Sequence, residues 1–85
     1  MDLKFSKHAK DKIELFEIKE EEILKSLRKP KYVCEDNNKQ STVYLVDVRG
    51  KLFSIVVKEG TIITVYRTDE KKLHSRIRSG RWNCY

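Results

Sequence analysis

The apolar side chains that precede Pro30 recur at helical spacing. The first set, at intervals of four, four and three residues, is Phe5, Ala9, Ile13 and Phe16. This spacing places them on one helix face, and Ser6 is a typical N-cap for such a helix. A second helix is predicted over about 20–28, with glutamates in its first turn and basic residues in its last, as the helix dipole favours. Its buried stripe is expected to be Ile23, Leu24 and Leu27.

After Pro30 the apolar period changes to two, and β-branched residues dominate. We expect strands at about 31–36, 41–48, 51–58 and 61–67. Arg49-Gly50 and Glu59-Gly60 are predicted to be two-residue hairpin turns, because glycine supplies the positive φ that such turns need. Short connections of this kind join antiparallel neighbours. Residues 69–78 are compatible with a further short helix.

This pattern predicts an α+β fold: two N-terminal helices followed by a four-stranded antiparallel β-meander and a basic C-terminal tail or short helix. Tight turns fix the register, and on that register Thr64 and Tyr66 share one face of the sheet while Arg67 lies on the other. Both faces are largely apolar, so both should be covered. The helices are expected to cover one face, and the tail or a second subunit the other.

The chain has 85 residues, of which 39% are hydrophobic and 38% are charged. It therefore forms one domain, 1–85, with one small core, and large cofactor-binding folds are excluded. No apolar run approaches the roughly 20 residues of a membrane-spanning helix. The N-terminus has no secretory signal, so the expected location is cytoplasmic.

The net charge of +6 is concentrated near the C-terminus. Residues 67–85 contain six cations and two carboxylates, which leaves +4 in this segment. A local basic excess favours polyanionic partners such as RNA. The side chains suited to phosphate contact and base stacking are Lys71, Lys72, Arg76, Arg78, Arg81 and Trp82. The alternative is a solvated helix face that docks on the sheet through Leu73 and Ile77, and both can hold at once.

Two cysteines, Cys34 and Cys84, stand far apart in the sequence. Neither has a second cysteine or a histidine close by, so no metal site is expected. Two free thiols are the preferred interpretation, with a disulfide as the alternative, because disulfides are rare in the cytoplasm.

Four polar residues are candidates for chemistry on RNA. His8 has the side chain best suited to proton transfer near neutral pH, and Lys12 lies one helical turn after it. A cation such as Lys12 or Arg67 can stabilise charge on a phosphate, and Tyr66 can position a phosphate or stack on a base. The alternatives are structural: an exposed helix histidine, a tyrosine at the edge of the core, and an arginine that pairs with Asp47.

Three segments carry a resemblance to a known family: Phe5-Ser6-Lys7-His8-Ala9, Ile18 with Glu20-Glu21-Glu22-Ile23, and Ile62-Ile63-Thr64-Val65-Tyr66-Arg67. Over about residues 3–68 the chain resembles an uncharacterised domain family. That family is grouped with the RelE/ParE-type toxins of bacterial toxin–antitoxin systems and with barnase-like nucleases. The resemblance implies a RelE-like fold, an antitoxin partner and metal-independent RNA cleavage. The superfamily also contains non-catalytic members, so fold alone does not assign function.

The resemblance also implies roles for particular residues. His8 would transfer the proton, while Lys12, which stands where the family usually has arginine, and Arg67 would stabilise phosphate charge. Thr64 and Tyr66 would orient the substrate. No metal or other cofactor is implied. Two alternatives are a non-catalytic nucleic-acid-binding module that uses the basic tail, and an interaction domain that forms a homodimer.

Overall fold

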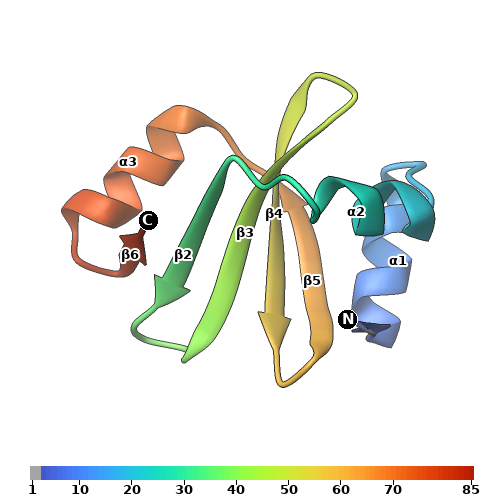
Figure 1. The fold of residues 1–85 in the computed structure, drawn as a ribbon, viewed down its shortest axis with the longest axis horizontal. Coiled ribbons are helices and arrows are strands. Elements are labelled where there is room, and N and C mark those ends of the chain that lie inside the picture. The colour runs from blue at the N-terminus through green and yellow to red at the C-terminus, as the bar shows by residue number, and fades with distance from the viewer. Residues whose placement is uncertain (1–2) are drawn as a thin grey trace.

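The computed structural model describes residues 3–85, which form a single mixed β-sheet with three helices. In chain order the elements are β1 (Lys4–Phe5), α1 (Lys7–Leu15), α2 (Glu20–Ser26), β2 (Tyr32–Asp36), β3 (Ser41–Val48), β4 (Lys51–Lys58), β5 (Thr61–Arg67), α3 (Glu70–Arg78) and β6 (Trp82–Cys84). The strand order across the sheet is β1-β5-β4-β3-β2-β6 (Figure 1). β2 to β5 form the meander, β6 pairs antiparallel with β2, and β1 pairs parallel with β5.

The predicted fold class is wrong in its sheet and in the order of its elements. The sheet has six strands and one parallel pair instead of four antiparallel strands, and the helices are interspersed among the strands: β1 precedes α1 and α2, and α3 lies between β5 and β6. The two unexpected strands, β1 and β6, have two and three residues. Segments so short show no period-two pattern, and their pairing partners lie far away in the sequence. The C-terminal segment 69–85 is consequently part of the fold: the short helix expected over 69–78 is present as α3, and β6 follows it.

The start of α1 is fixed by Ser6. Its hydroxyl accepts a hydrogen bond from the Ala9 amide at 3.0 Å and donates one to the Ile63 carbonyl at 2.8 Å. The first contact caps the helix, and the second ties it to β5. In α2, Ile23 is buried as expected, but Leu24 is 39% exposed, contrary to the prediction.

Both hairpin turns have the expected geometry, but β5 does not keep the expected pairing register with β4. Arg49 and Gly50 have φ of 54° and 77°, which suits a tight turn that joins β3 and β4 with Val48 opposite Lys51. In the next hairpin the register shifts within β5, where Val57 pairs with Ile62 and Val56 pairs with Thr64. The residue between them, Ile63, is therefore an extra residue, a β-bulge.

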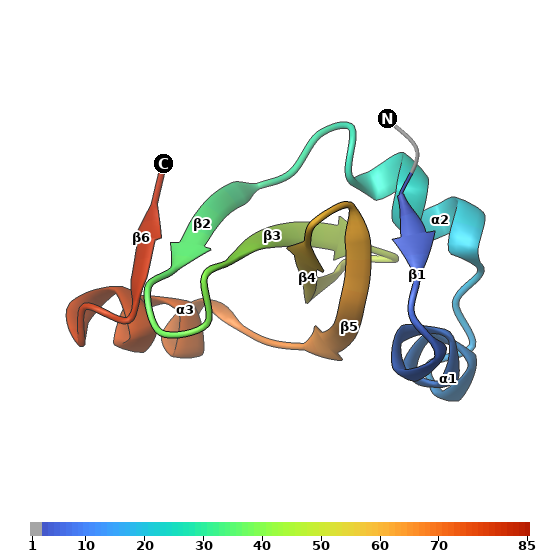
Figure 2. The same ribbon diagram turned by 90° about the horizontal axis from the view of Figure 1, so that it is seen from below.

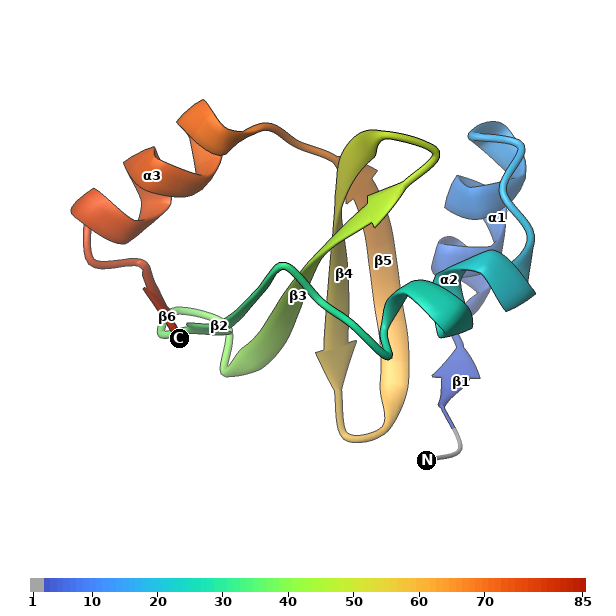
Figure 3. The same cartoon turned by 45° about the horizontal axis from the view of Figure 1, so that its top comes forward.

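Each face of the sheet has its own core. α1 packs along β5 and α2 against β3, and their apolar side chains join those of one sheet face in a cluster that includes Ala9, Ile13, Ile23, Val46, Phe53, Ile55, Ile62 and Val65. The opposite face carries the smaller cluster of Cys34, Val43, Leu45, Leu73 and Trp82, with Leu73 supplied by α3. Figures 2 and 3 show α1 and α2 at one end of the curved sheet and α3 at the other. The expectation that both faces are covered is confirmed, and the second cover is α3.

Cys34 and Cys84 form a disulfide, so the preferred interpretation of two free thiols is wrong. The two residues are directly paired in neighbouring strands, β2 and β6, with Cα atoms 3.9 Å apart. The two cysteines are 50 residues apart in the sequence, and their proximity depends on the pairing of β2 with β6, a strand that was not expected. Within residues 3–85, no helix is long and apolar enough to cross a membrane.

Candidate nucleic-acid interface

The candidate catalytic residues of α1 lie at the helix surface. His8 is exposed, and no hydrogen bond or ion pair within residues 3–85 joins its imidazole to another candidate. Lys12 is half-buried, with its ammonium group 5.5 Å from the centre of the Phe16 ring. The ring of Phe16 meets that of Phe53 edge to face, at a centroid distance of 5.4 Å. Lys12 is therefore held against an aromatic pair and not beside a hydroxyl group.

The β-bulge decides which face each candidate of β5 occupies. Thr64 lies opposite Val56 and Tyr66 opposite Ser54, so both side chains belong to the face that α3 covers. Arg67 lies opposite Phe53, on the face of α1 and α2, and its guanidinium carbon is 6.0 Å from the Phe53 ring centre. The predicted separation of Arg67 from Thr64 and Tyr66 is confirmed, although the bulge exchanges the faces that these residues would occupy on an uninterrupted register.

Four of the five candidate catalytic residues are consequently divided between two faces, and His8 is exposed on α1. Lys12 and Arg67 share the face of α1 and α2, while Thr64 and Tyr66 are on the other side of the sheet. A general base, a phosphate-binding cation and an orienting hydroxyl must surround one phosphate to act together. This arrangement does not bring them together in the described residues.

The basic residues of α3 form a shallow groove with the segment that follows the helix. Its lining consists of Lys72, Ser75, Arg76, Ser79 and Arg81, around a volume of about 450 Å³. The first four recur at intervals of three, one and three residues, so they share one face of the helix. Two hydroxyl groups and three cations line this α3 groove, and no carboxylate does.

The buried side chain of Trp82 supports the groove by packing against Arg76. The indole is 2% exposed, so it is not available to stack on a base, and the base-stacking role predicted for it does not fit this placement. One face of the ring is covered by the Arg76 guanidinium, whose carbon lies 4.9 Å from the ring centre. This cation–π contact holds Arg76 in place within the groove. Lys71 and Arg78 are exposed on α3 but do not line the groove.

Asp36 anchors the same region from β2. The carboxylate is 5% exposed and accepts hydrogen bonds from the Asn38 and Lys39 amides, at 3.0 and 3.1 Å, and from the Trp82 indole at 3.2 Å. Arg81 Nε lies 3.7 Å from Asp36 Oδ2. Burial by itself would raise the pKa of Asp36, but the hydrogen bonds and the Arg81 charge outweigh it and lower the pKa below its usual value.

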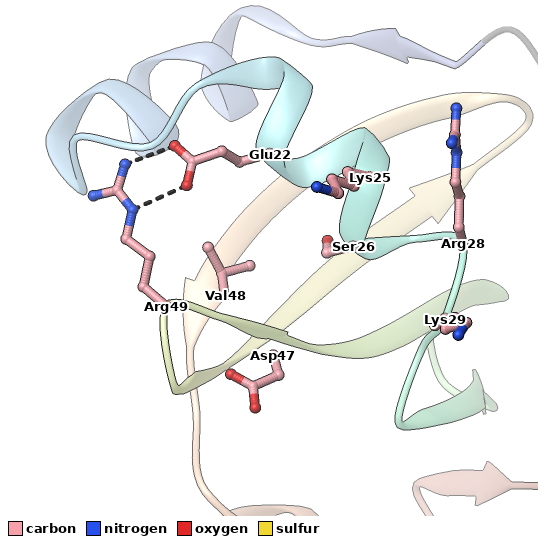
Figure 4. Close-up of a pocket in the computed structure, with 8 residues that line it drawn as sticks. All are labelled: Glu22, Lys25, Ser26, Arg28, Lys29, Asp47, Val48 and Arg49. Atoms are coloured by element: carbon pink, nitrogen blue, oxygen red, sulfur yellow. Dashed lines mark hydrogen bonds and ion pairs between the residues drawn. The ribbon is translucent and has the colours of Figure 1, made fainter.

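A larger hollow lies between α2 and the β3–β4 turn, and it has mixed charge. Figure 4 shows its lining, which consists of Glu22, Lys25, Ser26, Arg28, Lys29, Asp47, Val48 and Arg49 around about 600 Å³. Glu22 and Arg49 form a bidentate ion pair, with nitrogen–oxygen distances of 2.6 and 2.9 Å. The hydrogen bonds from Arg49, and then from the Lys19 amide, lower the pKa of Glu22. The carboxylates neutralise part of the basic surface here, so this hollow is a weaker anion site than the α3 groove.

Sequence reasoning identified the cations of the groove and missed its hydroxyl groups. Ser75 and Ser79 are four residues apart, and each is three residues after a groove cation, Lys72 or Arg76. This helical spacing was available as a signal. The contribution of Asp36 was not available, because it depends on the pairing of β2 with β6.

No family model, curated protein or solved structure matches this chain. Among residues 3–85 there is also no group of three or more histidine, cysteine or acidic side chains that could hold a metal ion.

Proposed function

We propose that the protein binds nucleic acid, with RNA as the first ligand to test, by contacting phosphates along the α3 groove. The observation that carries this proposal is the groove itself: three cations and two hydroxyl groups on one surface that has no carboxylate in its lining. Phosphate contacts by arginine and lysine supply most of the affinity of sequence-independent nucleic-acid binding. Serine hydroxyls are common additional donors to phosphate oxygens.

Two of the three cations are held in place before any ligand arrives. Arg76 rests on the Trp82 indole, and Arg81 is held by the buried carboxylate of Asp36. A side chain that is already ordered loses less conformational entropy on binding. This preorganisation supports a specific surface for phosphates as opposed to a mobile basic segment.

Binding without cleavage agrees better with the positions of the candidate catalytic residues. The ribonuclease hypothesis needs His8, a cation and the hydroxyls of β5 around one phosphate, and these groups lie on different faces. The α3 groove needs only the residues that line it. The antitoxin, homodimer and cytoplasmic location implied earlier remain predictions, and the disulfide weighs against a reducing compartment.

The test is RNA affinity with a matched pair of double variants. Lys72→Gln with Arg76→Gln removes two groove cations, and Lys7→Gln with Lys10→Gln removes two exposed cations of α1. Fluorescence anisotropy with a single-stranded RNA at fixed salt should show a loss of about 10- to 100-fold for the groove variant, as expected for two charge-assisted contacts. The α1 variant should change affinity much less. Equal losses in both variants would contradict a groove on α3.

Cleavage is measured on the same RNA in EDTA, with wild type beside His8→Ala. The proposal predicts intact RNA with both proteins and equal affinity for both. RNA that is cut by wild type but not by His8→Ala would overturn the binding-only proposal in favour of a metal-independent ribonuclease.

A further inference from the structure

A second, smaller hollow on the other face of the sheet brings three cations together over aromatic rings. It has a volume of about 140 Å³ and is lined by Phe16, Ile18, Val48, Arg49, Lys51, Phe53 and Arg67. We name it the Arg67 pocket. Its polar lining groups are all cations, since no carboxylate is among these residues.

Strand pairing forces two of these cations together. Arg67 lies directly opposite Phe53, and Lys51 stands two residues before Phe53 on the same strand and therefore on the same face. Lys51 and Arg67 are diagonal cross-strand neighbours, which places their backbones roughly 7–8 Å apart. None of the ion pairs within residues 3–85 includes either of them.

The β-bulge at Ile63 is what brings Arg67 to this face. Without the extra residue, Arg67 would lie opposite Leu52, on the face of α3, with Leu52 between it and Asp47. Bulges are common next to functional sites because they redirect a side chain. Here the bulge places Arg67 on the same face as Lys51, and two like charges at this spacing are unfavourable without an anion.

The third cation, Arg49, is oriented by Glu22. The carboxylate accepts hydrogen bonds from Nε and one terminal nitrogen, at 2.9 and 2.6 Å, which leaves the other terminal nitrogen for a further acceptor. A bidentate contact of this kind fixes the plane of the guanidinium. Glu22 itself does not line the Arg67 pocket.

No carboxylate is within ion-pair distance of Lys51 or Arg67 in residues 3–85, although three lie nearby. A neighbouring hollow of about 280 Å³ also reaches Lys51 and Arg67, and it includes Asp47, Asp69 and Glu70. Asp69 caps α3 by accepting from the Lys72 amide at 2.8 Å. Glu70 pairs with Lys31 at 3.4 Å. Asp47 is exposed, and among residues 3–85 no ion pair joins any of the three carboxylates to Lys51 or Arg67.

We propose that Arg67, Lys51 and Arg49 bind a single phosphate group in this pocket. Its volume corresponds to about five water molecules at roughly 30 Å³ each, which suits a group with four oxygens. It is below the roughly 300 Å³ at which sites for larger ligands begin. The rings of Phe16 and Phe53 exclude water from one side, which strengthens each charge-assisted hydrogen bond. This site is independent of the α3 groove, which lies on the opposite face.

The first probe is inorganic phosphate, added to isotope-labelled full-length protein at constant ionic strength set with potassium chloride. Amide resonances of Lys51, Phe53 and Arg67 should shift with a saturating curve below about 10 mM phosphate, the weak range expected for one small anion. Arg67→Gln should weaken binding about tenfold or more. Lys58→Gln, which removes an exposed lysine at the far end of β4, should leave it unchanged.

Lys51→Gln provides a second route if Arg67→Gln fails to fold, because Lys51 is exposed at the start of β4. Three results would each overturn the proposal. The first is that phosphate causes no saturable shift of the amide resonances, and the second is that Lys51→Gln and Lys58→Gln bind phosphate equally well. The third result is a shift confined to the amides of Lys72 and Arg76. The last result would still agree with the α3 groove, so the two proposals fail separately.

The source of the phosphate is then identified with two RNAs that differ only at one end. Tighter binding of a 5′-phosphorylated RNA than of its 5′-hydroxyl form, lost in Arg67→Gln, assigns the pocket to a terminal phosphate. Equal binding that is lost in Arg67→Gln assigns it to an internal backbone phosphate. Phosphate binding with no effect of Arg67→Gln on either RNA assigns it to free phosphate.

Discussion

At the residue scale, Asp36 connects the sheet to the C-terminal segment. Its carboxylate joins the β2–β3 turn, through the Asn38 and Lys39 amides, to Trp82 and Arg81. A buried carboxylate with this many donors is stabilising only while it is charged and all of its partners are present. The sequence did not single it out, because an aspartate before Asn-Asn is typical of an ordinary turn.

The first prediction concerns Asp36→Asn. We expect the free energy of unfolding at pH 7 to fall by about 1–3 kcal/mol, because the amide leaves one donor unsatisfied and Arg81 without its counter-charge. Since folding lowers the pKa of Asp36, its contribution is complete above the unfolded value of about 3.9 and is lost as the pH falls through the folded value. Urea denaturation at pH 7 and at pH 3 should therefore show a smaller difference between variant and wild type at pH 3.

The exposed Asp47 provides the control for that measurement. Asp47→Asn should leave the free energy of unfolding within about 0.5 kcal/mol of wild type. If Asp36→Asn differed from wild type by the same amount at both pH values, the carboxylate charge would not be the source of its stabilising effect.

At the element scale, the four strands of the meander could be predicted and the sheet could not. The alternation of apolar residues and the Arg49-Gly50 and Glu59-Gly60 turns give β2 to β5 almost to the residue, because both signals are local. β1, β6 and the bulge at Ile63 depend on pairing between distant segments. The disulfide and the position of Arg67 depend on these features, so neither was accessible to local reasoning.

The disulfide between β2 and β6 carries the second prediction. Chain-entropy estimates for a loop of 50 residues give about 4 kcal/mol, and measured values for native disulfides are commonly about 2–5 kcal/mol. Cys34→Ser with Cys84→Ser should therefore lower the free energy of unfolding by that order. The loss should be local first, because β2 is the one strand that pairs with β6 among residues 3–85.

Hydrogen exchange measures this local effect. The Tyr85 amide donates to the Val33 carbonyl at 2.9 Å and should exchange faster in the double serine variant than in wild type. Amides in the centre of β4, which is paired on both sides, exchange through global unfolding, so their protection should fall only by the loss of global stability. Unchanged exchange at Tyr85 would show that side-chain packing, and not the disulfide, holds β6.

At the scale of the whole molecule, the sheet separates two basic surfaces of different character. The α3 groove is long and open, with hydroxyl groups between cations, whereas the Arg67 pocket is small and has an aromatic floor. Thr64 and Tyr66 belong to the first face, and Lys12 belongs with Arg67 to the second. The residues expected to form one catalytic site are thus distributed around two candidate phosphate sites.

The salt dependence of RNA binding distinguishes the contributions of these two surfaces. For single-stranded nucleic acid, the slope of log K against log salt decreases by about 0.7 for each phosphate contact that is lost. Lys72→Gln with Arg76→Gln should therefore reduce the slope by about 1.4, and Arg67→Gln should reduce it by about 0.7 only for an RNA whose phosphate occupies the Arg67 pocket. Because the sites lie on opposite faces and share no residue, the free-energy losses should add in the triple variant within about 0.5 kcal/mol. This test uses the RNA whose binding Arg67→Gln weakens. If the triple variant bound that RNA no more weakly than the groove variant, the losses would not add. That result would contradict two independent phosphate sites on opposite faces of the sheet.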